Sequence, residues 1–150
     1  YAKNTNAEFL FTGASYINAE GLYYEGLFEI PHQVTFKNLK KHNVISCSSV
    51  LIKKKFFKNI KMENDNIHED YAVWLQVLRT GVQAHGINEP LLIYRISKKS
   101  KSGNKFKTIP MTYGVFRFIG LNPISSTYYM FRHVIASIKK YRTIGKLISS

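Results

Sequence analysis

The residues best suited to acid–base chemistry in this chain are His68-Glu69-Asp70-Tyr71. They open an apolar stripe at the spacing of one helix face, formed by Tyr71, Trp74, Leu75 and Leu78. Asp70 lies four residues before Trp74 and therefore borders this stripe, whereas Glu69 points further outward. The pattern indicates one carboxylate held at a helix N-terminus and aimed into a cleft, where it can act as a general base. The alternative is that both carboxylates only complement the helix dipole, worth about 0.3–1 kcal/mol each.

The helix that must position Asp70 is predicted to run from about Ile67 to Thr80. Asn66 can cap its start, with Glu69 three residues later as the reciprocal partner of a capping box. Arg79 and Gly81 mark its end.

Two further segments have residue types that suit ligand binding. Ser46-Cys47-Ser48-Ser49 has small side chains that let the backbone approach a ligand closely, or that allow close strand packing. After a strong strand at residues 91–96, the cationic segment 97–104 can fold over a diphosphate, or it can be a solvated basic loop. The candidate groups there are Arg95, Ser100, Ser102 and Lys105.

Composition predicts one domain with a substantial core. The chain has 150 residues, of which 45% are hydrophobic, and no apolar run long enough to span a bilayer. The lone Cys47 excludes an internal disulfide and a cysteine zinc cage.

Charge is unevenly distributed along the chain. Residues 1–89 hold ten Lys/Arg and nine Asp/Glu, whereas residues 90–150 hold twelve Lys/Arg and no acid. Such a basic C-terminal part implies a polyanionic partner, either anionic lipid, nucleic acid or a phosphorylated ligand.

The coarse pattern is α/β. Strands are predicted at residues 7–16 running on toward Ile17, at 22–30, at 44–53, at 82–85 and at 91–96, with Gly26 interrupting the second and Pro90 separating the last two. Helices are predicted just after Thr35, which is a candidate N-cap, and at residues 105–119 and 125–148.

The last predicted helix is basic and amphipathic. Arg132, Lys139 and Lys146 recur every seven residues, with His133 and Lys140 beside them. The apolar residues Phe131, Val134, Ile138 and Tyr141 are expected to insert shallowly into an anionic membrane surface. The competing interpretation is that this apolar face packs on the domain itself.

Taken together, these segments resemble the C-terminal half of a family 2 glycosyltransferase of the GT-A fold, of the type that builds bacterial capsule, lipopolysaccharide or exopolysaccharide chains. The resemblance covers about residues 7–107. It rests on residues 11–18 with Glu20-Gly21, on residues 45–50, on Glu69-Asp70-Tyr71-Ala72-Val73-Trp74-Leu75, on Gly81 and Ala84, on residues 88–95, and on Ser100-Lys101-Ser102 with Asn104-Lys105.

The resemblance implies an inverting transfer from a nucleotide-sugar to a glycan or lipid-linked acceptor. Asp70 would be the catalytic base, with Glu69 beside it. Arg95, Ser100 and Ser102 would lie near the donor diphosphate, and the remaining expected substrate-binding residues are Cys47, Ser48, Trp74 and Lys105. The enzyme would be peripheral on the cytoplasmic face of the membrane.

One departure from the family pattern concerns the metal site. The family carries its metal-binding Asp-x-Asp motif in a preceding nucleotide-binding half, and no Asp-x-Asp occurs in this chain. The expectation is therefore a partial GT-A-like mixed sheet with flanking helices at residues 1–107, followed by a helical basic extension at 108–150. A divalent Mg or Mn ion would be held outside this chain, which would be inactive alone.

Two other functions compete with this interpretation. A basic nucleic-acid-binding module would explain the cations after Glu89, although no motif for it is present and nucleic acid is not the expected partner. A membrane-surface module without catalysis would explain the basic helix equally well.

Overall fold

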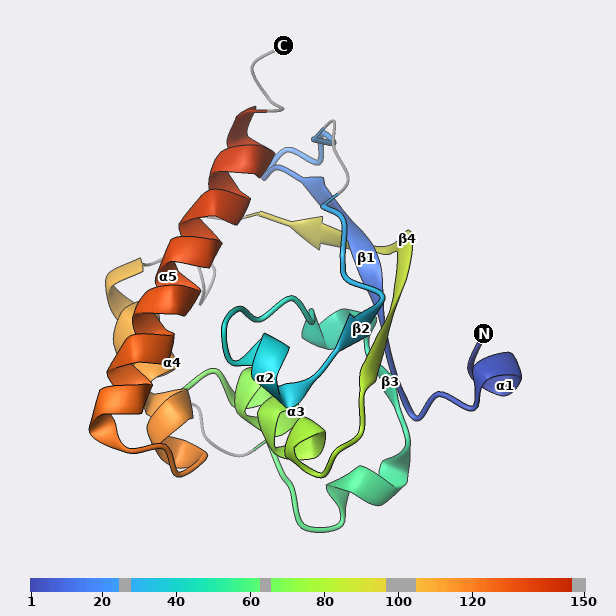
Figure 1. Ribbon diagram of the computed structural model, residues 1–150. Coiled ribbons are helices and arrows are strands. Elements are labelled where there is room, and N and C mark those ends of the chain that lie inside the picture. The colour runs from blue at the N-terminus through green and yellow to red at the C-terminus, as the bar shows by residue number, and fades with distance from the viewer. Residues whose placement is uncertain (25–27, 63–65, 97–104, 147–150) are drawn as a thin grey trace.

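A four-stranded mixed sheet organises the chain in the computed structural model, which describes residues 1–24, 28–62, 66–96 and 105–146 (Figure 1). The strands are β1 (Phe9–Ile17), β2 (Gln33–Val34), β3 (Leu51–Ile52) and β4 (Ala84–Arg95), in the order β2-β4-β1-β3. β1 and β4 are parallel, and the two short strands pair antiparallel on either side. The predicted α/β class with a mixed sheet is confirmed.

Helices flank this sheet. They are α1 (Ala2–Thr5), α2 (Phe36–Leu39), α3 (Glu69–Arg79), α4 (Lys105–Phe118) and α5 (Pro123–Lys146), with 3-10 turns η1 (Cys47–Ser49) and η2 (Lys54–Phe57). Thr35 caps α2 through a complete capping box with Asn38, as its sequence position predicts. Within the described residues, no helix combines the length and the apolar character needed to cross a membrane.

The long strand β4 differs from the prediction of two strands separated by Pro90. Pro90 lies inside β4, and the β1–β4 register shifts between Thr12 and Ala14. Proline has no N–H to donate to a sheet, so the ladder accommodates it at an irregularity. Gly13 allows the close approach there, because a Cβ on it would lie 3.0 Å from the Glu89 carbonyl oxygen.

Two predicted strands are wrong over most of their length. In the described parts of residues 22–30, pairing is reduced to an isolated bridge between Ile17 and Tyr23. In residues 44–53 only β3 is a strand. The backbone N–H and the hydroxyl of Ser49 both donate to the Ser46 carbonyl, at 3.0 and 2.8 Å, and so form η1 instead. Serine hydroxyls compete with sheet ladders in this way.

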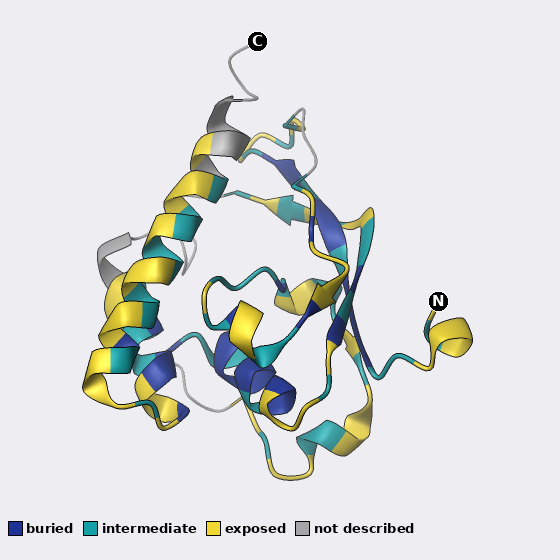
Figure 2. Ribbon diagram, in the orientation of Figure 1, coloured by how far each residue is buried: buried dark blue, intermediate teal, exposed yellow. Residues whose placement is uncertain are grey.

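Helix α3 is the centre of the core, and Figure 2 shows it almost entirely buried. The predicted stripe is confirmed, with Tyr71, Trp74, Leu75 and Leu78 each at most 2% exposed. Trp74 packs on Phe9 of β1 at a ring-centroid distance of 5.3 Å. The predicted cap is wrong: His68, not Asn66, is the N-cap of α3.

Helices α4 and α5 pack against each other, and they lie across the molecule from α1 (Figure 1). Val115, Phe116 and Ile119 belong to the same hydrophobic core as α3. The expected boundary near residue 107 therefore does not separate two hydrophobic cores.

Replacing Tyr71 by Phe should lower the free energy of unfolding by about 1–3 kcal/mol. The buried Tyr71 hydroxyl donates to the Leu39 carbonyl at 2.8 Å and ties α3 to α2, so its removal leaves that carbonyl without its donor. Urea unfolding measures the change. Tyr23→Phe is the control because Tyr23 is 63% exposed. Equal effects of the two variants would contradict the prediction.

Candidate active site

A cavity of about 340 Å³ lies between the sheet, the segment 42–48, the start of α3 and the inner side of α5. Among the described residues, its walls combine a carboxylate with hydroxyls, imidazoles, aromatic rings and an ammonium group. They include Thr12, Tyr16, Phe28, His42, Ser46, Cys47, Ser48, His68, Asp70, Tyr71, Tyr94, His133, Ser137 and Lys140.

Asp70 stands in the first turn of α3 and lines this cavity. Its Oδ1 accepts a hydrogen bond from the Tyr71 backbone N–H at 2.8 Å, which fixes the carboxylate at the helix start. Burial raises the pKa of Asp70 above its ordinary value, and the opposing Tyr71 hydrogen bond and nearby His68 do not cancel this effect. A carboxylate with a raised pKa is a stronger base, so the cavity holds a group suited to taking a proton from a ligand.

Glu69 faces elsewhere, as its helix position predicts. It lines a second cavity, together with Lys61, Ala72 and Gln76. The two adjacent carboxylates therefore serve different surfaces. Asp70 lines the main cavity, whereas Glu69 lines the second one.

Cys47 and Ser48 share the main cavity with Asp70. Burial raises the pKa of the Cys47 thiol, and the charge of Asp70 raises it further, which reflects their closeness. The structure thus brings together three of the predicted site residues from two segments more than 20 residues apart in the sequence.

The other predicted site residues lie outside this cavity or outside the described residues. Trp74 is a core residue, 2% exposed, and its predicted contact with substrate finds no support in the geometry. Arg95 is exposed at the end of β4 and donates to the carbonyls of Asn18 and Ala19, at 3.2 and 2.9 Å. Ser100 and Ser102 lie outside the described residues. Lys105 begins α4, and its side chain is likewise not described.

Sequence reasoning missed the contribution of α5. His133, Ser137 and Lys140 fall at i, i+4 and i+7 and line the cavity from the inner side of the helix. Their spacing is the signal in the sequence, but the sequence pattern alone predicts that His133 and Lys140 lie beside the basic row of Arg132. The structure separates them, because Arg132 and Lys139 are exposed whereas His133 and Lys140 are partly buried.

His133 packs in an aromatic group at the cavity wall. Its ring centroid lies 5.3 Å from that of Tyr71 and 5.8 Å from that of His42. Burial lowers the pKa of His133 to about 3 and that of His42 to about 4, with a further contribution to the latter from Lys140. Both imidazoles are therefore neutral near pH 7.

The described residues do not fit a metal centre. Among them no group of three or more His, Cys, Asp or Glu side chains comes together as a possible ligand set.

Replacing Asp70 by Asn should leave the fold at pH 7 as stable as the wild type or more stable. Because burial raises its pKa, folded Asp70 holds its proton more tightly than the unfolded chain does. The free energy of unfolding therefore falls as pH rises from the unfolded to the folded pKa, and the ionised carboxylate destabilises the fold above that window.

Urea unfolding of both proteins at pH 7 and near pH 4 tests this. The advantage of Asp70→Asn should shrink at the lower pH, where the wild-type carboxyl takes up its proton. An Asn variant that loses stability only at pH 7 would show that the helix-dipole contribution outweighs burial.

Comparison with known proteins finds bacterial glycosyltransferases. The chain is 32% identical over 133 residues to TuaG of Bacillus subtilis (strain 168), which is named as a glycosyltransferase of teichuronic acid biosynthesis. It is 28% identical to two Escherichia coli proteins, WfaP over 131 residues and WfgD over 138 residues. Both are named UDP-Glc:alpha-D-GlcNAc-diphosphoundecaprenol beta-1,3-glucosyltransferase.

These matches cover 87–91% of the chain but only 52–53% of each relative. The chain thus spans about half the length of the curated relatives it matches. No family model matches the chain, and no solved structure matches it. The similarity supports a glycosyltransferase relationship over most of the chain.

Proposed function

We propose that this chain is the acceptor-side, C-terminal half of an inverting family 2 glycosyltransferase with a GT-A-like fold, acting in bacterial surface polysaccharide synthesis. The observation that carries the proposal is Asp70, a carboxylate of raised pKa at a helix start on the main cavity. The similarity to three glycosyltransferases supports the reaction class. The mixed sheet is compatible with a partial GT-A-like fold.

In the proposed reaction Asp70 takes the proton of an acceptor hydroxyl. The freed oxygen attacks the anomeric carbon of a nucleotide-sugar from the face opposite the diphosphate. The bond from that carbon to the diphosphate oxygen breaks, and the nucleoside diphosphate leaves with the electron pair. One displacement of this kind inverts the anomeric configuration.

The rest of the cavity would position the acceptor. Cys47 and Ser48 are small enough for a sugar to approach the backbone, and the rings of Tyr16 and Tyr94, 5.9 Å apart, offer apolar faces for stacking. The hydrogen bond from the Tyr71 N–H fixes the Asp70 carboxylate, which lowers the cost of reaching the reactive geometry.

The donor nucleotide and its divalent ion, Mg or Mn, would be bound by a part of the protein outside these 150 residues. This division accounts for the chain spanning about half of its relatives. It also predicts that the chain alone is inactive. Arg95 and the segment after it would bind the donor diphosphate. In the structure, Arg95 already donates hydrogen bonds to the carbonyls of Asn18 and Ala19.

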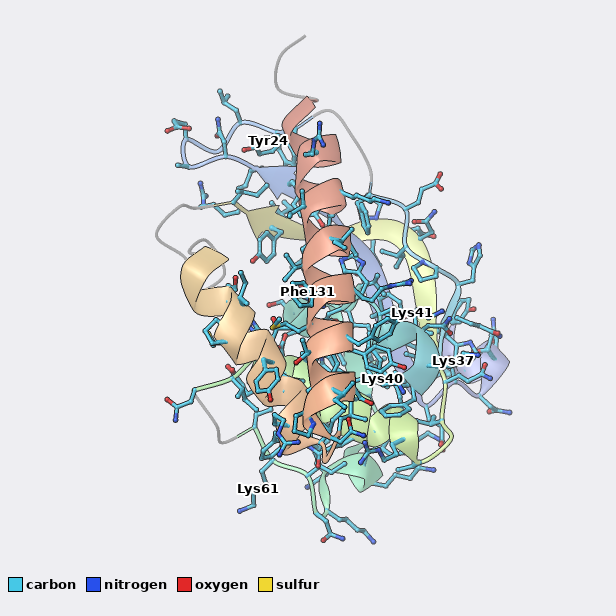
Figure 3. The ribbon with its side chains drawn as sticks, turned by 60° about the vertical axis from the view of Figure 1, so that its left-hand side comes forward. Tyr24, Lys37, Lys40, Lys41, Lys61 and Phe131 are labelled. Atoms are coloured by element: carbon cyan, nitrogen blue, oxygen red, sulfur yellow. The ribbon has the colours of Figure 1, made fainter. Side chains whose placement is uncertain are left out.

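The outer face of α5 supports an association with anionic membrane. Its exposed apolar residues are Ile124, Tyr128, Phe131, Ile135 and Ile138, at alternating spacings of four and three. Figure 3 looks onto this face, with Phe131 on α5 and, to its right, Lys37 of α2 and the following Lys40 and Lys41. Arg132, Lys139 and Arg142 are also exposed there. Of the residues expected to insert, Val134 is partly buried, and the side chains of Tyr141 and Lys146 are not described.

A transfer assay on the full-length protein tests the function. UDP-glucose and N-acetylglucosaminyl-diphosphoundecaprenol are the first probes, since two relatives are named for them. A panel of other nucleotide-sugars with the same acceptor follows. Product of inverted configuration supports the proposal. Salt-sensitive retention of nucleic acid without any transfer would favour the rival binding module.

A further inference from the structure

Lys140 is a cation in an unusual place. It lines the main cavity from α5, and its ammonium nitrogen lies over the rings of Phe28 and Tyr16, at 4.6 and 5.6 Å from their centroids. Among the described residues, ion pairs within salt-bridge distance are formed by Lys53 and Lys55 with Glu8, and none involves Lys140. The aromatic faces and the helix hold the ammonium group without supplying a carboxylate.

Desolvation makes this arrangement costly. Burial lowers the pKa of Lys140, which reports that the charged form is disfavoured where it sits. A buried charged side chain is normally neutralised by a shift of its pKa, paired with an opposite charge, or used to bind a charged ligand. Cation–π contacts with Phe28 and Tyr16 compensate for part of the cost.

The surroundings of Lys140 are those of an anion site. His133 and Ser137 precede it on the same helix face and line the same cavity. The Nδ1 atom of His133 is buried and has no hydrogen-bond partner. Among the described residues of the cavity wall, Asp70 is the carboxylate, and Lys140 does not pair with it. The cavity therefore carries a base on α3 and a separate cation on α5 that pairs with no carboxylate of the described residues.

We propose that Lys140, with His133 and Ser137 beside it, forms a subsite on α5 that binds the diphosphate of a substrate in the Asp70 cavity. The inference rests on the proposed function, because diphosphate is the polyanionic group that the substrates of that reaction share. A lysine ammonium binds phosphate oxygens as a compact point charge. The Ser137 hydroxyl and the His133 imidazole can supply further hydrogen bonds.

The placement favours the acceptor over the donor as the source of this diphosphate. The opposite face of α5 carries the exposed apolar stripe around Phe131 and Ile135. A helix lying on the membrane by that stripe would place Lys140 one helix diameter above the lipid. A lipid-linked diphosphate would then reach Lys140 while its sugar extends toward Asp70.

Binding of inorganic pyrophosphate to the full-length protein tests the subsite without any transfer reaction. Lys140→Met keeps the aliphatic stem on Phe28 and Tyr16 and removes the charge. It should weaken binding about 10- to 100-fold, as expected for one charge-assisted contact, whereas Lys140→Arg should retain most of it. Lys37→Met is the matched control, since it removes an exposed lysine on α2 (Figure 3). Equal affinities for the wild type, Lys140→Met and Lys37→Met would overturn the proposal.

Steady-state kinetics then separate the two sources. A higher KM for N-acetylglucosaminyl-diphosphoundecaprenol in Lys140→Met, with an unchanged KM for UDP-glucose, assigns the subsite to the acceptor. The reverse assigns it to the donor. If neither KM moves, Lys140 binds no substrate diphosphate. If wild-type protein binds pyrophosphate through Lys140 but transfers no sugar, the subsite stands and the proposed reaction fails.

Discussion

Asp70→Asn is expected to lower the rate of glycosyl transfer by the full-length enzyme about 10²- to 10⁴-fold, the usual loss on removing a general base. The amide keeps the size of the carboxylate and an oxygen that can accept the Tyr71 N–H, so the start of α3 should keep its geometry. The affinity for the nucleotide-sugar should be unchanged, because Asp70 acts on the acceptor.

Glu69→Gln provides the matched control. Glu69 is the neighbouring carboxylate on the same helix turn, but it lines the second cavity. If the general base must lie on the main cavity, Glu69→Gln should retain at least about a tenth of the wild-type rate. Comparable losses in both variants would show that charge at the α3 N-terminus, rather than a base in the cavity, supports activity.

The pH profile gives an independent measurement of the same group. Transfer should decline as pH falls through the pKa of Asp70, which lies above its ordinary value because of burial. The acidic limb of kcat/KM should therefore appear above the pH range in which an ordinary aspartic acid titrates, and it should vanish in Asp70→Asn.

The sequence was most informative where local pattern and tertiary burial agree. The helix face of Tyr71, Trp74, Leu75 and Leu78 specified α3, and Asp70 could be placed at the edge of its buried stripe. The positions of β1 and of the two C-terminal helices were also predicted from the sequence. In α5, however, the apolar residues Phe131, Ile135 and Ile138 are exposed, so the apolar periodicity predicts the helix without identifying a buried face.

Prediction failed where long-range pairing decides the structure. Pro90 in its local sequence predicts the end of a strand. In the structure, Gly13 of β1 lies opposite it, and the absence of a side chain there allows β4 to run on beside β1. The serines of residues 46–49 read as a small-residue strand, whereas their hydrogen bonds close a 3-10 turn. Lys140 and Lys139 are adjacent in the sequence, and only the orientation of α5 puts one on the cavity and the other outside.

Association of the full-length protein with anionic liposomes is expected to depend on the outer face of α5. Phe131 and Ile135 are 59% and 53% exposed, so each can bury apolar area in a bilayer interface. Full burial of such a side chain contributes about 1.5–3 kcal/mol. Each nearby cation contributes about 1 kcal/mol at an anionic surface, and this attraction is screened by salt.

The double variant Phe131→Ala/Ile135→Ala should therefore lower the liposome partition coefficient about 10- to 100-fold. Alanine keeps the helix, and the replaced side chains support little of the fold because they are exposed. Leu22→Ala/Leu91→Ala is the control, since these two leucines are 68% and 67% exposed on other parts of the surface. Flotation with anionic and with neutral vesicles, at low and high salt, measures the effect.

If the protein floats equally well with both vesicle types, or if the α5 variant floats as well as the wild type, this face of α5 has only a structural role. A loss of vesicle binding that is confined to the α5 variant and to anionic vesicles would support a separate role for each face of α5. Its apolar face would lie on the lipid, and its inner face, with Lys140, would close the cavity in which Asp70 receives the acceptor proton.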